Sequence, residues 1–271
     1  MTYRDHDDHK HGLEFDLEAL AQQRMRRRGV LTLLGGGAAL LAGAYSPAAL
    51  AEALCIADPE ETAGPYPGDG SNRSRGNTSN ILSESGVVRS DIRASFGTST
   101  NIAEGLPLTL RIKIGDAGNA CAPLPGYAIY LWHCTKDGKY SLYTQPDENY
   151  LRGVQVADEE GYVTFTTIFP GCYDGRWPHM HFEIYPSLDV ATDHRNAVLT
   201  SQFAFPEDVC REVYASVAGY EQSVAALEHT SLDRDMVFAD NSDDEVAMMT
   251  PALTGNVADG YSGEITVALA V

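Results

Sequence analysis

The chain has 271 residues and is 44% hydrophobic, which is enough to bury the core of one domain of about 200 residues with additional segments. Its formal net charge of −19 gives a surface that repels nucleic acid and anionic membranes, so both are poor candidates as partners of the mature protein. The charge does not restrict the choice of a small-molecule ligand.

The N-terminal 51 residues have the pattern of an export signal. Arg26-Arg27-Arg28 precedes an apolar, Gly- and Ala-rich run that ends at Ala49-Leu50-Ala51, a small-x-small cleavage pattern. The long polar leader and the arginine cluster resemble a twin-arginine signal, which exports folded proteins. We expect cleavage after Ala51, export to the periplasm or the extracellular space, and a mature domain of residues 52–271. The alternative is an uncleaved membrane anchor, for which the apolar run is short.

The mature part is predicted to be mainly β. Apolar and polar residues alternate from Leu108 to Ile114, as in a half-buried strand. Further strands are expected at Ala128–Cys134, Tyr162–Phe169, His179–Tyr185, Val198–Phe205 and Glu264–Ala270. Many short strands with few helices and long loops favour a two-sheet antiparallel β-sandwich.

Two short helices are expected, one that opens at Pro206-Glu207-Asp208-Val209 and one over Glu221–His229. The acidic stretch from Asp240 to Glu245 is interpreted as a solvated segment before the last strand.

The five cysteines, Cys55, Cys121, Cys134, Cys172 and Cys210, all follow the predicted signal. In an oxidising compartment some of them should pair, and an odd number leaves at least one thiol. We expect a disulfide between Cys121 and Cys134, which flank a predicted strand, and Cys172 as the odd thiol. Buried thiols without a disulfide are the alternative.

The most informative segment is Pro170-Gly171-Cys172-Tyr173-Asp174-Gly175-Arg176-Trp177-Pro178-His179-Met180-His181. Alternate side chains of a strand share a face, so His179 and His181 point the same way, about 7 Å apart at Cα. Two imidazoles on one face can bind one metal ion, and Tyr173 comes from the adjoining turn. Tyrosinate is a hard oxygen donor that suits ferric iron, so this segment indicates an iron site.

At this point the chain resembles the intradiol ring-cleavage dioxygenases, the family of catechol 1,2- and protocatechuate 3,4-dioxygenases, and most closely their secreted single-domain members. The likeness runs from Glu61 to Phe205. Besides the segment above, the motifs that carry it are Cys121-Ala122-Pro123-Leu124-Pro125-Gly126, Trp132-His133-Cys134, Asp137-Gly138-Lys139-Tyr140-Ser141, Leu151-Arg152-Gly153-Val154-Gln155 and Gly161-Tyr162-Val163-Thr164-Phe165. One departure is Cys172, where the secreted members often have tryptophan.

The resemblance implies a non-haem Fe(III) site with four ligands, one ion per chain. They are Tyr140, Tyr173, His179 and His181 in this sequence. Arg176 matches the active-site arginine of the family, and Gln202 aligns with a glutamine near the substrate.

The implied reaction is intradiol cleavage of a catechol-type aromatic diol. Phenolate ligands stabilise Fe(III), which acts as a Lewis acid toward the diol. By analogy with the family, Tyr173 leaves the metal when substrate binds and accepts a proton, whereas Tyr140 stays bound. Arg176 stabilises the charge that develops, and both atoms of O2 enter a cis,cis-muconate-type diacid.

Each of these residues also has a plainer interpretation. The chain contains 14 tyrosines, any of which could be a half-buried strand residue, and a His-x-His pair could bind zinc or form a buried polar pair. Arg176 could make only a salt bridge, and Gln202 could only satisfy backbone groups. The alternative function is therefore a non-catalytic, secreted β-sandwich that binds an aromatic or carbohydrate ligand.

Overall fold

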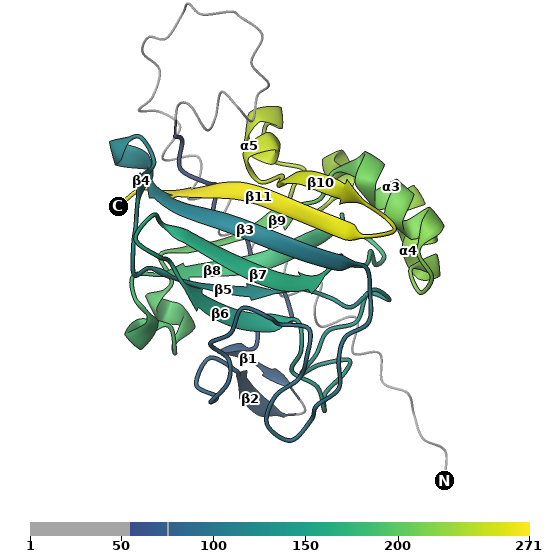
Figure 1. Ribbon diagram of the computed structural model, residues 1–271, viewed down its shortest axis with the longest axis horizontal. Helices are drawn as coiled ribbons and strands as arrows, with labels where there is room; N and C mark the ends of the chain where they lie inside the picture. Colours follow the sequence, from purple (N-terminus) through teal and green to yellow (C-terminus); the bar gives the residue numbers. More distant parts are fainter. Residues whose placement is uncertain (1–54, 75) are drawn as a thin grey trace, which may run out of the picture.

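The computed structural model describes residues 55–74 and 76–271 (Figure 1). The predicted export signal, residues 1–51, lies outside the described residues. In the described part of the chain, no helix combines the length and the apolar character that crossing a membrane requires.

The predicted two-sheet β-sandwich is confirmed. One sheet contains β10 (Ala252–Asn256), β11 (Gly260–Leu269), β3 (Pro107–Asp116), β4 (Ala122–Pro123) and β7 (Tyr162–Ile168). The other sheet has the order β6 (Arg152–Val156), β5 (Ala128–Trp132), β8 (His179–Tyr185) and β9 (Leu199–Ala204). A separate hairpin of β1 (Asp69–Ser74) and β2 (Asn77–Asn80) lies at the lower end of the molecule in Figure 1.

The hydrophobic core lies between the two sheets. It receives Leu110 and Ile112 from β3, Leu131 from β5, and Met180 and Phe182 from β8. These side chains come from alternate positions, as the two-residue period of a strand dictates. The remaining positions of β8, which include both predicted histidine ligands, therefore face away from this core.

One strand pair departs from the antiparallel pattern. β11 runs parallel to β3, from Tyr261 beside Leu108 to Leu269 beside Asp116. A parallel neighbour needs a long crossover, and the chain between β9 and β11 supplies one through three helices and β10. The last strand is thereby placed next to the first strand of its sheet.

Both predicted helices form, as α3 (Glu207–Ser216) and α4 (Glu221–Glu228), at the right-hand end of Figure 1. The acidic segment 240–245 is mostly exposed, as expected, but it is not a tail, because α5 (Asp243–Met248) begins within it. Ser242 caps it: its hydroxyl accepts a hydrogen bond from the Glu245 amide, and the Glu245 carboxylate accepts one from the Ser242 amide. Short 3-10 helices are η1 (Ala117–Asn119), η2 (Leu188–Val190), η3 (His194–Asn196) and η4 (Leu232–Arg234).

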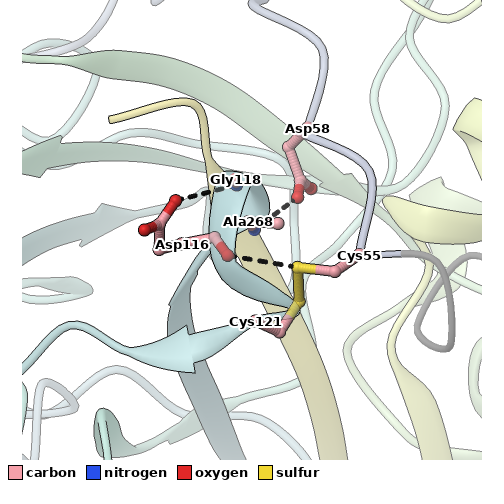
Figure 2. Close-up of a disulfide and its surroundings, with 6 residues drawn as sticks. All are labelled: Cys55, Asp58, Asp116, Gly118, Cys121 and Ala268. Carbon is pink, nitrogen blue, oxygen red and sulfur yellow. Dashed lines mark hydrogen bonds between the residues drawn. A yellow bond between two sulfur atoms is a disulfide. The ribbon is translucent and has the colours of Figure 1, made fainter.

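The expected Cys121–Cys134 disulfide is wrong. Cys121 instead pairs with Cys55, with a Cα–Cα distance of 5.4 Å (Figure 2). Cys121 and Cys134 lie beyond opposite ends of β5, and a five-residue strand keeps its ends about 13–17 Å apart, too far for a disulfide. Cys172 is a buried thiol as expected, and Cys134 and Cys210 are buried thiols as well.

Residues 58–67, here called the strap, connect this disulfide to the outer face of the second sheet. At the outer end, the Asp58 amide donates to the Ala268 carbonyl at 2.9 Å. The Ala268 amide donates to Asp58 Oδ2 at 2.7 Å, as Figure 2 shows. The strap then reaches β8 at Gly64, whose φ of +70° suits glycine. A Cβ at this position would lie 3.2 Å from His181 Cε1, so the strap packs directly against this imidazole.

Candidate metal centre

The two predicted histidine ligands lie side by side on β8. His179 and His181 are separated by Met180, which points into the core, and their Nε2 atoms are 3.1 Å apart. Trp132 of β5 is the cross-strand neighbour of His181 and stacks on it, with ring centroids 5.0 Å apart and planes 5° from parallel. Among the described residues, no group bonds to His181 Nδ1, so packing sets the orientation of this ring.

Tyr140 approaches the histidines from the loop that follows β5. Its amide donates to the Thr144 hydroxyl at 2.7 Å, and its ring packs on Tyr66 of the strap, 5.0 Å between centroids. The side chain is fully buried. Its hydroxyl lies 3.2 Å from His181 Nε2 and 3.4 Å from His179 Nε2.

Tyr173 approaches from the turn between β7 and β8. Its hydroxyl lies 3.1 Å from His179 Nε2 and 3.4 Å from the Tyr140 hydroxyl. Unlike Tyr140, it is only half-buried. Gly171 permits the close approach of this turn, because a Cβ there would lie 2.6 Å from the Thr135 and Lys136 carbonyls.

The structure thus brings all four predicted ligand atoms to one place, with the reported separations between 3.1 and 3.4 Å. Nitrogen and oxygen donors that surround one first-row metal ion at about 2.0–2.2 Å are themselves about 3.0–3.5 Å apart. The donor set therefore fits a single ion. Within residues 55–74 and 76–271, no group of three or more His, Cys, Asp or Glu side chains could hold a metal, so this cluster depends on its two phenols.

The histidines present lone pairs to the cluster. Burial lowers the pKa of His179 to about 3, and the charge of Arg176 contributes. Burial, together with His179, also places the pKa of His181 well below its usual value. His179 Nδ1 faces the Trp177 carbonyl and must carry the proton to bond with it, which leaves Nε2 as the acceptor.

Both phenols are held in their protonated form when no cation is bound. Burial, with Tyr173 as a close neighbour, raises the pKa of Tyr140 well above 10. Burial likewise raises the pKa of Tyr173, although the positive charge of Arg176 opposes the shift. A bound cation reverses this preference, because a metal ion deprotonates the groups that ligate it. Metal binding at this site would therefore release protons.

Arg176 and Gln202, the other two predicted site residues, lie beside the donor cluster. Arg176 Nη1 is 3.4 Å from His179 Nε2, and Nη2 donates to Gln202 Oε1 at 2.6 Å. Gln202 is the β9 neighbour of His181, and its Nε2 donates to the Thr62 carbonyl of the strap at 2.8 Å. All six predicted site residues are therefore in one contiguous group.

Two buried residues at the site were missed by the sequence reasoning. Asp235 accepts a hydrogen bond from Arg176 Nε at 3.0 Å, and the sequence reasoning assigned it no role. The apolar run Met236-Val237-Phe238 directly after it was the available signal of burial. Arg152 of β6 donates to Ser141, which follows Tyr140, and to the Tyr66 and Pro67 carbonyls of the strap. No motif chemistry in the sequence indicated that role.

A family model described as Dioxygenase matches residues 94–246, more than half of the chain. Chlorocatechol 1,2-dioxygenase of Rhodococcus opacus is 30% identical over 92 residues, which are 29% of this chain and 36% of that protein. Catechol 1,2-dioxygenase of Pseudomonas sp. (strain EST1001) is 36% identical over 71 residues, 26% of this chain and 23% of that protein. The chain thus spans about a third or less of the length of these two relatives.

Among solved structures, an intradiol ring-cleavage dioxygenase from Tetranychus urticae superposes with a TM-score of 0.60 at 24% identity. The match covers 79% of this chain and 95% of that one, so the two share a fold over nearly the whole of the smaller protein.

Proposed function

Because the chain belongs to the intradiol ring-cleavage dioxygenase family, we propose that it opens catechol-type aromatic diols between the two hydroxylated carbons. The bond between those carbons breaks, both atoms of O2 enter the product, and a cis,cis-muconate-type diacid forms. The observation that carries this proposal is the convergence of two phenols and two neutral imidazoles beside a buried arginine.

Tyr140, Tyr173, His179 and His181 would hold one non-haem ferric ion, since mixed oxygen and imidazole donors suit iron. When bound, the ion supplies Lewis-acid chemistry that lowers the pKa of the diol hydroxyls. The two neutral histidines bring no charge, so the two phenolates supply the negative charge that favours the ferric state.

The two tyrosines have different roles. Tyr140 is fully buried and packed against the strap, so its phenol stays in place during turnover. Tyr173 is half-buried and comes from a turn that contains Gly175 at a φ of +81°, so it is the phenol that substrate can reach and displace. Burial raises the pKa of Tyr173, which makes its phenolate a stronger base toward a diol proton.

Arg176 and Gln202 act on the substrate side. The guanidinium is buried, 6% exposed, and keeps its positive charge in a site with little water. A fixed cation at this position stabilises the negative charge that develops as the ring opens. Gln202 holds the guanidinium and the strap at the same time, which aligns the arginine with the edge of the site.

The protein works outside the cytoplasm in this proposal. The Cys55–Cys121 disulfide supports an oxidising compartment, where such bonds persist. The twin-arginine pattern supports export of the folded chain, which would carry its metal with it.

The proposal is tested by measuring the visible absorption spectrum and the oxygen uptake of the purified protein. Phenolate-to-Fe(III) charge transfer should give the purified protein a broad visible absorption band, and a panel of catechols should drive oxygen consumption with formation of diacid products. Tyr173→Phe should keep some iron but lose at least about 100-fold in kcat, because the displaceable base is gone.

The matched control is Tyr162→Phe on the other sheet, which should keep wild-type rates. A colourless protein that binds zinc and ligand but consumes no oxygen would instead support the non-catalytic binding module. Wild-type turnover in Tyr173→Phe would contradict the role assigned to that phenol.

A further inference from the structure

Asp235 is a buried carboxylate beside the site that accepts four hydrogen bonds. It lies in residues 231–239, after α4, and its side chain is 0% exposed. Oδ1 accepts from the Val237 and Phe238 amides at 2.8 and 3.2 Å, which fixes the carboxylate to its own turn. Oδ2 accepts from Arg176 Nε at 3.0 Å and from the Trp177 amide at 2.5 Å.

These bonds determine the direction in which Arg176 points. The guanidinium is planar and carries its donors in a rigid fork, so two anchored edges fix its plane. Asp235 holds Nε, and Gln202 holds Nη2. The remaining nitrogen, Nη1, is left 3.4 Å from His179 Nε2, at the donor cluster.

The charges of the pair are maintained despite burial. Burial would raise the pKa of Asp235, but Arg176 and the backbone amides outweigh it and lower that pKa. Burial would lower the pKa of Arg176, and Asp235 reverses that effect. A buried ion pair is a poor source of stability compared with apolar packing, so its presence beside the cluster calls for another role.

We infer that Asp235 is the positioning residue for Arg176, and that it aims Nη1 at the place where negative charge develops in the reaction. This inference rests on the proposed function. Asp235 does not touch the donor cluster itself. It acts through the arginine, and its bond to the Trp177 amide holds the turn that precedes His179. Segment 231–239 would thus be part of the catalytic machinery although it lies far from the ligand motifs in sequence.

The test is a double-mutant cycle with Asp235→Asn and Arg176→Lys. Asp235→Asn keeps one acceptor oxygen for the Val237 and Phe238 amides, but it removes the charge and replaces by an NH2 group the oxygen that accepts from Arg176 Nε and the Trp177 amide. We expect full iron content, an unchanged visible band, a KM for catechol within about threefold of wild type, and a kcat lower by about 10–100-fold. The double variant should be hardly slower than Arg176→Lys alone, because Asp235 has nothing left to position.

Asp91→Asn is the matched control, because Asp91 also binds an arginine, Arg93, but on an exposed surface. It should change neither kcat nor KM. Multiplicative losses in the double variant, or an unchanged kcat in Asp235→Asn, would overturn the inference. If Asp235→Asn does not fold, the cycle is repeated with Asp235→Glu, which displaces the carboxylate by one methylene, and a wild-type kcat there would be equally contradictory.

A crystal structure of Asp235→Asn separates this inference from the proposed function. We expect Nη1 of Arg176 to leave its position beside His179 Nε2, a change visible even in metal-free protein. An unmoved guanidinium would overturn the positioning role. If the wild-type protein binds no iron and takes up no oxygen, the proposed function is overturned. The position of Arg176 in Asp235→Asn would then still show whether Asp235 orients the guanidinium.

Discussion

The central strands of the two sheets differ in how they use their outer faces. On β3, buried residues alternate with exposed ones over most of the strand, and charged side chains such as Arg111 face solvent. On β8 every residue is buried, although four of its seven positions carry His, Glu or Tyr. The difference arises because the strap, the Tyr140 loop and residues 81–82 together cover the outer face of the second sheet and enclose the polar residues of β8. The donor cluster is enclosed because a third layer closes over the sheet.

The largest effect, on iron content and on kcat/KM, is expected when one donor atom of the cluster is removed. Tyr140→Phe deletes only a hydroxyl whose partners are the other donors, so the fold should persist. Iron content and the visible band should fall to a small fraction of wild type, and kcat/KM should fall by at least about 10³-fold. Metal analysis and oxygen uptake measure this, and a Tyr140→Phe protein with full colour and activity would remove Tyr140 from the ligand set.

A smaller effect, on the free energy of unfolding, is expected when one arginine of each sheet is replaced by methionine. Arg152→Met deletes a fully buried cation that bonds the strap and the Tyr140 loop, so the free energy of unfolding should fall by about 3–5 kcal/mol. Arg111→Met removes an exposed ion pair with Glu264 and a contact with the Tyr162 ring, and should cost about 1 kcal/mol or less. Urea denaturation measures both, and equal losses would contradict the contrast between the faces.

The smallest effect on the donor cluster should follow from opening the disulfide. Cys55→Ser combined with Cys121→Ser removes a crosslink between residues 66 apart and should cost about 2–4 kcal/mol of stability. Iron content should remain, because the strap keeps its bonds at Gln202 and Arg152. Thermal unfolding with and without reductant measures the loss, and a wild-type Tm in the double variant would exclude a stabilising role.

Local patterns accounted for the strands and for the residues that form the donor cluster. Alternation located β3, and the exact bounds of β8 followed from the segment that carries both histidines. The four donor atoms were predicted as one group and lie as one group. The prediction of these four residues depends on several motifs that occur in the right order, because neither Tyr140 nor Tyr173 stands out among the 14 tyrosines by itself.

Long-range features could not be predicted in the same way. The pairing of Cys55 with Cys121 and the parallel alignment of β11 join segments far apart in sequence, and no local pattern encodes either. The apolar run after Asp235 could have indicated that this residue is buried, but no local pattern identifies Arg176, 59 residues away, as its partner.

The strap also ties the two sheets of the sandwich to each other. Its outer end bonds to Ala268 of β11, in the first sheet, whereas its inner end lies on His181 of β8, in the second sheet. The backbone of residues 58–67 is thus a tether between the two layers, in addition to the core that they share. A change in the spacing of the layers would therefore reach the His181 imidazole through Gly64.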